Sequence, residues 1–491
     1  MYETSNKKNV SKLTACIMFN LLLIIFLILM PFYQEDIYFK NYLVDMFCTM
    51  GVMSLCLNYS VNFGFDLFDP IYTITFIYGF LYFVTPIYDI LSQKYYWYGY
   101  SMFPYGIKAT LIAFAGYISF YIAYSWKTNL EKEEGASNFI NNKLHTRMPI
   151  SEKKNQVDEK EREMIPLILV LYVVSFAANV YYLIHSGYTN LLYIMSLGLL
   201  GNEGGSAPEL SSIGFVAMFS YCLPTLVLLY WQCSKRSFVT LLLFIPMLMM
   251  QVARGFRFFI VQIAITFASY YFLTKHKRPK LRQILMLFFT LMIPVVVMTM
   301  FRNDIRSGAG ITISQINMES IKKAFSAAIW DNFRVYNNYY GVVHMVPRVF
   351  GYVYGRQIFG GIFIMMIPRI IWPNKISPGA GADISQIIGI NLFGTGQAYP
   401  GLGEYYYAFG VAGVIIFMAL YGLIVRYIRN RYLYGARNGY DIIAFSVLLG
   451  ANLQILIRGY TPSNFWYVVF SLLPVVIIKT VNKSILESDE Q

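Results

Sequence analysis

Apolar runs long enough to cross a lipid bilayer recur along most of this chain of 491 residues. A helix needs roughly 20 apolar residues to span the hydrocarbon core. Hydrophobic residues make up 57% of the chain, charged residues only 13%, and the mean hydropathy is +0.50, which is too apolar for a soluble fold of this length. Backbone groups in lipid must be paired internally, and the alternating ten-residue segments of a barrel are missing, so the sequence predicts an all-α polytopic membrane protein.

We expect about twelve membrane-spanning helices from the length and periodicity of the apolar runs. They cover residues 13–32, 42–59, 70–89, 106–126, 165–185, 213–231, 238–253, 257–274, 283–301, 409–426, 441–457 and 464–480. Residues 1–301 hold the first nine spans and a cytoplasmic linker at 127–164. Residues 302–408 form a large extracytoplasmic loop with helical and re-entrant segments, and residues 409–491 hold the last three spans and a cytoplasmic tail.

The basic residues between spans predict the orientation of the chain. Strongly basic short segments lie at 127–162, 235–236, 275–282 and 426–431, and all fall on one side if the N-terminus is inside. Both termini are then cytoplasmic. The net charge of +13 therefore reports orientation, and nucleic acid is not an expected partner. The five cysteines lie in or at the ends of predicted spans without C-x-x-C spacing, so we expect neither a disulfide framework nor a metal site.

Arginines on the opposite side of the membrane depart from this pattern. They are Arg254 and Arg257 before the eighth span, Arg302 and Arg306 after the ninth, Arg458 after the eleventh, and Arg334, Arg348, Arg356 and Arg369 in the long loop. An arginine near hydrocarbon costs roughly up to 3 kcal/mol, so several at one face favour an anionic partner such as a lipid-linked phosphate. The alternative is that these side chains reach lipid headgroups or pair with acids such as Asp331 and Asp383.

The second half of the long loop combines aromatic residues with turn formers. It contains Trp372, the segment PGAGAD at 378–383 and the segment GTGQAYPGLGEYYY at 394–407, which includes Tyr399, Tyr405 and Tyr406. Aromatic faces beside amide and carboxylate groups suit sugars. The alternative is an aromatic belt, which is expected at any membrane interface.

Several of these motifs resemble one protein family. The segments PRIIWPNK at 368–375, GAGAD at 379–383 and YPGLGEYYYAFGVAGVII at 399–416 resemble the C-terminal half of bacterial O-antigen polymerases of the Wzy type. The segment RGFRFFIVQI at 254–263 is similar to the arginine-containing start of an earlier span in that family. A single large, late external loop also matches its topology.

The resemblance implies a GT-C-type glycosyltransferase of lipopolysaccharide biosynthesis in the bacterial inner membrane. A growing glycan on undecaprenyl diphosphate would be transferred en bloc to the non-reducing end of a new lipid-linked repeat unit. The partners would be the two lipid-linked oligosaccharides, membrane lipids and a chain-length regulator protein. No metal, cofactor or nucleotide sugar would be needed.

The chemistry of this transfer suggests roles for individual residues. Negative charge develops on the departing diphosphate, so arginines placed there would stabilise the transition state; the candidates are Arg254, Arg257, Arg302, Arg306, Arg369 and Arg458. The attacking hydroxyl needs a base, and Glu404, between a Gly-Leu-Gly bend and the tenth span, is the first candidate. His344 and Asp383 are the others. Alternatively, Glu404 caps a helix and His344 is a structural histidine.

Three other functions remain open from the sequence. An O-antigen ligase would share the topology, the arginines and the donor, and would differ in transferring the glycan to lipid A core sugars. A flippase for lipid-linked oligosaccharide would need charged residues within the bundle and short loops on both sides, which disagrees with the long loop and the nearly uncharged spans. A structural or receptor-like protein would not need clustered arginines.

Overall fold

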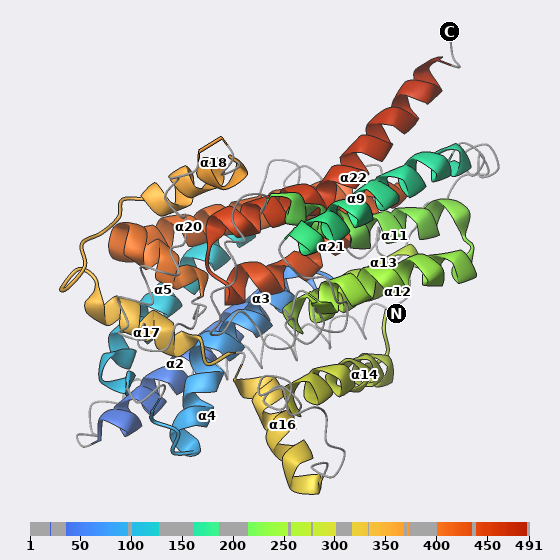
Figure 1. The fold of residues 1–491 in the computed structure, drawn as a ribbon. Helices are drawn as coiled ribbons and strands as arrows, with labels where there is room; N and C mark the ends of the chain where they lie inside the picture. The colour runs from blue at the N-terminus through green and yellow to red at the C-terminus, as the bar shows by residue number, and fades with distance from the viewer. Residues whose placement is uncertain are drawn as a thin grey trace.

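The computed structural model describes residue 20 and residues 36–96, 101–126, 161–185, 215–253, 257–275, 278–300, 317–331, 333–367, 371–372, 400–434 and 438–488. Within these ranges every regular element is a helix, and most helices lie side by side in one bundle (Figure 1). The prediction of an all-α protein is therefore confirmed.

The first half of the chain contributes α2 (Ile37–Phe63), α3 (Pro70–Gly79), the π-helical turn η2 (Phe80–Val84), α4 (Thr85–Leu91), the short η3 (Phe103–Tyr105), α5 (Gly106–Ser125) and α9 (Ile165–His185). The middle contributes η4 (Val216–Tyr221), α11 (Cys222–Ser234), α12 (Ser237–Ala253), α13 (Arg257–Thr274) and α14 (Leu281–Met300). The remainder forms α16 (Met318–Trp330), α17 (Tyr336–Met345), η6 (Arg356–Gly360), α18 (Gly361–Met366), α20 (Gly401–Tyr434), α21 (Gly439–Ile457) and α22 (Thr461–Ser488).

Eight helices among the described residues are long and apolar enough to cross a membrane. They are Ile37–Phe63, Pro70–Leu91, Phe103–Ser125, Glu161–Tyr182, Val216–Ser234, Gly401–Tyr432, Gly439–Ile457 and Thr461–Asn482. The spans predicted at 238–253, 257–274 and 283–301 are helices too, but their described apolar stretches are shorter. Apart from residue 20, the predicted span 13–32 lies outside the described residues. A polytopic membrane protein is confirmed, and the count of twelve stays a prediction.

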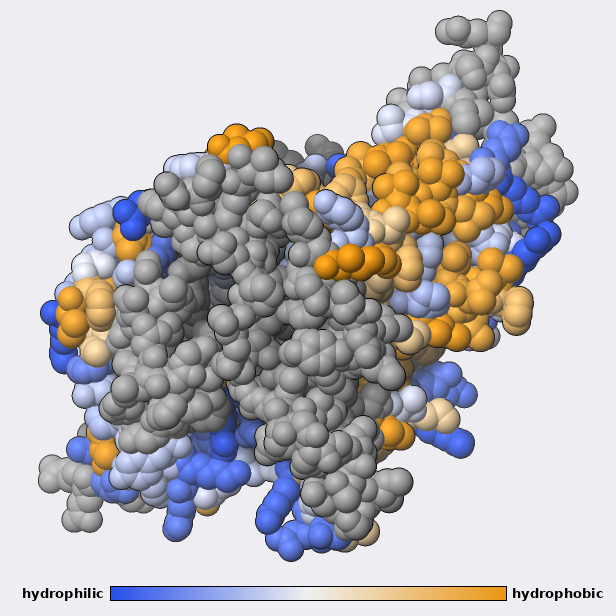
Figure 2. Space-filling model, in the orientation of Figure 1, coloured by the Kyte–Doolittle hydropathy of each residue, from blue (hydrophilic) through white to orange (hydrophobic). Residues whose placement is uncertain are grey.

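The surface of the bundle is apolar where lipid would contact it. On α9 and α12, large side chains such as Val173 and Phe238 are 62% and 78% exposed. Figure 2 shows hydrophobic surface gathered on the side of the molecule where α9, α12 and α22 lie in Figure 1. A helix that turns such side chains outward without a protein partner is stable only in an apolar solvent, which the bilayer supplies.

Tyrosine is the commonest large residue in the core formed by α2, α3, α5, α17 and α20. Fully buried examples are Tyr59, Tyr78, Tyr82, Tyr117, Tyr336, Tyr339, Tyr340 and Tyr406. Their hydroxyl groups find partners on neighbouring helices: Tyr78 donates to the carbonyl of Ala113 at 2.6 Å, and Tyr339 donates to that of Ala109 at 3.0 Å. Each ring fills core volume while its hydroxyl pairs a backbone group, which ties α3 and α17 to α5.

The long loop is largely helical where the structure describes it. Asn317 begins α16 with a capping box, in which its side chain accepts from the backbone N–H of Ser320 at 2.7 Å. The helical part of the loop forms two helices, α16 ending at Trp330 and α17 beginning at Tyr336. The apolar segment that starts near residue 358 forms η6 and α18, and the indole of Trp466 on α22 donates to the carbonyl of Ile362 at 2.8 Å.

Helix α20 begins earlier than the sequence predicts. We expected the tenth span to start at residue 409 after a glycine bend, but the helix starts at Gly401 and is interrupted at Phe409 and Gly410, where Gly410 has φ +64°. The carbonyls of Tyr407 and Ala408, which the kink frees, accept from the N–H groups of residues 353 and 354 at 3.1 and 3.0 Å. The glycines near Glu404 therefore form a helical turn, and the carboxylate projects from a helix.

Candidate functional site

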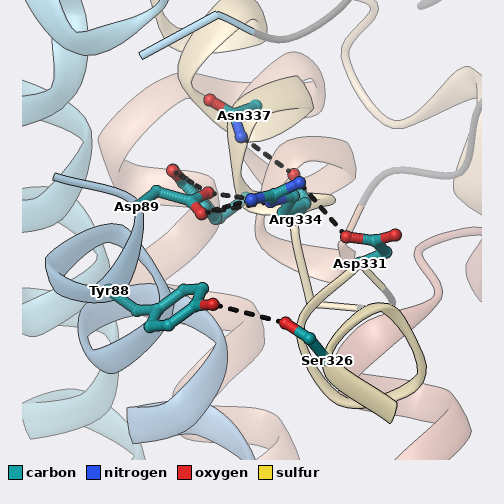
Figure 3. Close-up of polar contacts among 7 residues, drawn as sticks. Tyr88, Asp89, Ser326, Asp331, Arg334 and Asn337 are labelled. Atoms are coloured by element: carbon teal, nitrogen blue, oxygen red, sulfur yellow. Dashed lines mark hydrogen bonds and ion pairs between the residues drawn. The ribbon is translucent and has the colours of Figure 1, made fainter. Parts of the chain in front are cut away.

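The helices of the long loop are fixed to the membrane bundle by a buried ion pair. The guanidinium of Arg334, between α16 and α17, donates to the carboxylate of Asp89 on α4 from Nη2 at 2.7 Å and from Nε at 3.1 Å (Figure 3). Asp331 accepts from Nη1 at 3.1 Å, and the hydroxyl of Tyr336 donates to Asp89 at 3.0 Å. Partial burial opposes the charge of Arg334, but Asp89 outweighs it and raises the pKa of the guanidinium above its ordinary value.

Aromatic stacking strengthens the same junction. The ring of Trp330 lies parallel to that of Tyr88, with their centroids 3.8 Å apart, and the Tyr88 hydroxyl lies 3.3 Å from that of Ser326. Phe80 packs on the indole of Trp330 at 5.0 Å. Because Arg334 is engaged on both sides by carboxylates, it is a structural residue and does not offer its charge to a ligand. The alternative that a loop arginine pairs with Asp331 therefore holds for Arg334.

The end of the bundle that carries this junction, which we call the loop end, also holds termini of α5, α20, α21 and α22. Helix α17 contacts Asp89 through Tyr336 and α5 through Tyr340. Lys108 on α5 lies beside Tyr406 on α20, and Glu404 on α20 contacts the turn between α21 and α22.

Glu404 lies at the loop end, on the first turns of α20, and is only 1% exposed. Its Oε2 accepts from the N–H of Thr461 at 2.7 Å, the hydroxyl of Thr461 at 2.6 Å and the N–H of Tyr460 at 3.2 Å. The carboxylate thus caps the N-terminus of a different helix, α22, and fixes α20 to the turn between α21 and α22.

The two oxygens of Glu404 have different surroundings. Oε2 has three donors, whereas Oε1 is buried and has no hydrogen-bond partner among the described residues. The turn that Glu404 holds includes Tyr460, whose backbone φ of +108° is rarely adopted by residues other than glycine. The same turn carries Arg458, whose carbonyl accepts from the amide of Asn464 at 2.8 Å. Glu404 therefore holds the turn that also contains Arg458, one of the predicted diphosphate-binding arginines.

A second group at the loop end surrounds the C-terminus of α17. The ring of His344 stacks on that of Tyr105 with centroids 3.4 Å apart, and its Nδ1 is buried without a partner among the described residues. Burial and the nearby charge of Arg348 lower the pKa of His344, so the imidazole is neutral at neutral pH. Arg348 is exposed, and the ammonium of Lys108 on α5 lies 3.3 Å from the hydroxyl of Tyr406. Two cations and a neutral imidazole thus lie near one another.

The other predicted site residues are placed as follows. Asp383, Arg254, Arg302, Arg306, Arg369 and Tyr399 lie outside the described residues, and Arg257 is the first residue of α13. Trp372 is 41% exposed. Tyr405 stacks on Phe417 at 4.8 Å, and Tyr406 is buried with its hydroxyl 3.4 Å from the carbonyl of Val346. Among the residues described here, no group of three His, Cys, Asp or Glu side chains is close enough together to hold a metal ion.

Sequence reasoning missed Lys108, Asp89 and Thr461. Lys108 falls in the first turn of a predicted span, at the side of the membrane where basic residues are not expected, and that position is the signal that could have found it. Asp89 ends another span as an isolated acid. Thr461 follows Tyr460 as an ordinary helix-capping residue, and nothing in the sequence indicates that its partner lies on α20.

The family model described as O-antigen polysaccharide polymerase Wzy matches residues 8–485, nearly the whole chain. No curated protein and no solved structure gives a significant match. The matched range takes in the Glu404 turn, the His344 group and the arginine-bearing segments.

The anchor between the loop helices and the bundle can be tested with Asp89→Asn. The substitution leaves the partly buried guanidinium of Arg334 with a neutral partner, so we expect a loss of up to about 3 kcal/mol of stability, the lower bound for a fully buried ion pair. Thermal unfolding of the purified protein in detergent measures it, and faster proteolysis between α16 and α17 should accompany it. Asp331→Asn is the control, because Asp331 is 48% exposed and should contribute little. Equal unfolding temperatures for wild type and Asp89→Asn would refute the anchor.

Proposed function

The chain belongs to the O-antigen polysaccharide polymerase Wzy family, whose members polymerise lipid-linked O-antigen repeat units, and from this premise we propose how its loop end carries out the reaction. The protein is a membrane enzyme of the glycosyltransferase type in lipopolysaccharide biosynthesis. The observation that carries this assignment is the family match over residues 8–485. We propose undecaprenyl diphosphate as the lipid carrier, with the growing glycan as donor and a new repeat unit as acceptor.

In this proposal arginines bind the diphosphate of the donor at the loop end. Arg254, Arg257, Arg302, Arg306, Arg369 and Arg458 remain the candidates, with the exposed Arg348 and Lys108 adding positive charge beside α17. Breaking the anomeric C–O bond leaves its electron pair on the diphosphate, so guanidinium groups that contact its oxygens stabilise the transition state more than the ground state. Arg334 is not one of these candidates, and its ion pairs with Asp89 and Asp331 give it a structural role.

Glu404 is the proposed base for the acceptor hydroxyl. Its Oε1 has no partner among the described residues, and an oxygen in that state can accept the proton that the hydroxyl loses as it attacks the anomeric carbon. Its Oε2 stays bonded to Thr461, which fixes the orientation of the carboxylate. His344 and Asp383 are the alternative bases. The competing role for Glu404 is the capping of α22 alone, and the variants below separate the two.

We propose a GT-C-type architecture with about twelve spans. Eight candidate spans and further apolar helices among the described residues support it. By the distribution of basic loops, the loop end faces away from the cytoplasm and both termini are cytoplasmic in the bacterial inner membrane. Trp372, Tyr399, Tyr405 and Tyr406 remain proposed glycan contacts, and a chain-length regulator remains a proposed partner.

Glu404→Gln tests the chemical role of Glu404. The amide oxygen can still accept from Thr461 and Tyr460, so capping is retained while the basic Oε1 is replaced by an N–H donor. If Glu404 is the base, elongation should fall by at least about 100-fold, the usual contribution of a general base. The measurement is the length distribution of polymer made by an equal amount of inserted protein. Thr461→Val is the comparison variant. It removes the hydroxyl bond to Oε2 but keeps both backbone N–H donors and the basic Oε1, so elongation should fall much less than in Glu404→Gln. Normal polymer length with Glu404→Gln would remove the proposed role.

Arg257→Lys and Arg306→Lys test the diphosphate contacts. A lysine keeps the charge but lacks the planar fork that binds two phosphate oxygens at once, so we expect turnover to fall about tenfold for each variant. Turnover is measured with lipid-linked repeat units in proteoliposomes. Arg334→Lys is not a suitable control because it would disturb the anchor, whereas Lys322→Arg on the exposed face of α16 is. Unchanged turnover in both test variants would argue against the assignment.

Deleting the gene separates polymerisation from the neighbouring steps. Loss of a polymerase should leave a single repeat unit on lipid A core, visible as one band above the core on a gel of surface polysaccharide. Absence of attached glycan with retained lipid-linked polymer would instead indicate a ligase. Absence of any exported repeat unit would indicate a flippase.

A further inference from the structure

A polar cavity lies inside the bundle, and one of its walls is the first half of α13. Its volume is about 20 Å³, enough for a single water-sized group, and it lies among α11, α13, α21 and α22. Its polar lining comes from Thr225, Gln262, Thr266, Ser471, Tyr221 and Tyr467. The rings of Tyr221, Phe259 and Tyr467 pack against one another at centroid distances of 4.9 to 6.0 Å.

Gln262 is the unusual member of this lining. It is 1% exposed, and neither its Nε2 nor its Oε1 has a hydrogen-bond partner among the described residues. Leaving a buried donor and a buried acceptor unpaired costs free energy. A ligand group that pairs both atoms removes that cost on binding.

The pair of unpaired atoms selects the chemistry of the ligand. A phosphate ionised at neutral pH offers mainly acceptors, so it could pair Nε2 but not Oε1. A polyprenyl chain could pair neither. A hydroxyl group both donates and accepts, and aromatic rings beside it suit the C–H faces of a sugar.

The position of the cavity along α13 places it close to the proposed diphosphate site. Gln262 is five residues after Arg257, about 7 Å along the helix axis. Phe259, which also lines the cavity, lies in the first turn of α13, two residues after Arg257. A sugar attached to a diphosphate held near Arg257 could therefore extend one hydroxyl-bearing arm toward Gln262.

We propose that this cavity is a carbohydrate subsite, in which Gln262 binds a hydroxyl-bearing substituent of the sugar next to the diphosphate. The assignment rests on the proposed function, because it takes the lipid-linked glycan as the ligand. Gln262 positions the substrate and takes no part in bond making. Its amide selects for a polar substituent at that place on the sugar, which makes the residue a determinant of which repeat units the enzyme accepts.

Gln262→Met tests the subsite, because it keeps the side-chain shape and removes both polar atoms. The probe is the lipid-linked repeat unit extracted from cells that lack the gene, with full-length protein in nanodiscs. We expect its affinity to fall about tenfold, the effect of losing one or two hydrogen bonds, with the unfolding temperature unchanged or higher. In turnover assays KM should rise while kcat stays within about twofold.

Two further variants complete the test. Gln262→Asn retracts the amide by one methylene and should weaken binding less than Gln262→Met does. The asparagine variant also tests the subsite if the methionine variant does not insert into the membrane. Ser446→Ala is the matched control, since it removes a buried hydroxyl on α21 that has no partner in the described part of the chain and does not line the cavity. It should leave affinity unchanged.

The outcomes distinguish the subsite from the proposed function. Equal affinities for wild type and Gln262→Met would overturn the subsite and indicate a cavity that holds only structural water. A wild-type protein that binds the probe but does not lengthen it would count against the proposed function, while a loss of affinity in Gln262→Met would still support the subsite.

Discussion

Buried carboxylates join helices of this protein that are distant in sequence. In an apolar environment an unpaired carboxylate is costly, so each one fixes the position of the groups that donate to it. Asp89 holds the loop helices through Arg334, and Glu404 holds the α21–α22 turn through Thr461. At the other end of the bundle, Asp69 accepts from Arg429 at 2.8 Å and from the hydroxyl of Tyr59 at 2.9 Å. These bonds join α3, α4, α17, α20 and α22 into one framework.

This framework separates structural charges from those available to a substrate. Arg334 forms ion pairs with Asp89 and Asp331, whereas Arg348 is exposed near His344. Glu404 has one structural and one available oxygen. Oε2 accepts three hydrogen bonds, and Oε1 has no partner among the described residues. A carboxylate oriented by one oxygen can present the other in a fixed direction, which is the arrangement that general-base chemistry requires.

A polymerase of lipid-linked repeat units has to bind these units and join them, and in the mechanism proposed here it also stabilises a leaving diphosphate and excludes wrong sugars. The proposed sites divide these tasks by chemistry. Guanidinium groups suit the diphosphate, Glu404 suits the attacking hydroxyl, and the Gln262 cavity suits a neutral hydroxyl. Aromatic hydroxyls such as those of Tyr78 and Tyr339 hold the intervening core with bonds to backbone carbonyls, so the sites are built on fixed helices.

The sequence alone determined the membrane class, most of the helices and the resemblance to the polymerase family, because apolar run length and local motifs are properties of consecutive residues. It did not determine that the glycines before Glu404 would join α20, since the carbonyls freed at Gly410 are paired by residues 353 and 354 from the loop. Nor could it show that Arg334 meets Asp89, that Glu404 caps α22, or that Gln262 borders a cavity and finds no partner for its amide within the described ranges. Those features depend on contacts between residues far apart in the chain, and only the tertiary packing decides which polar groups meet.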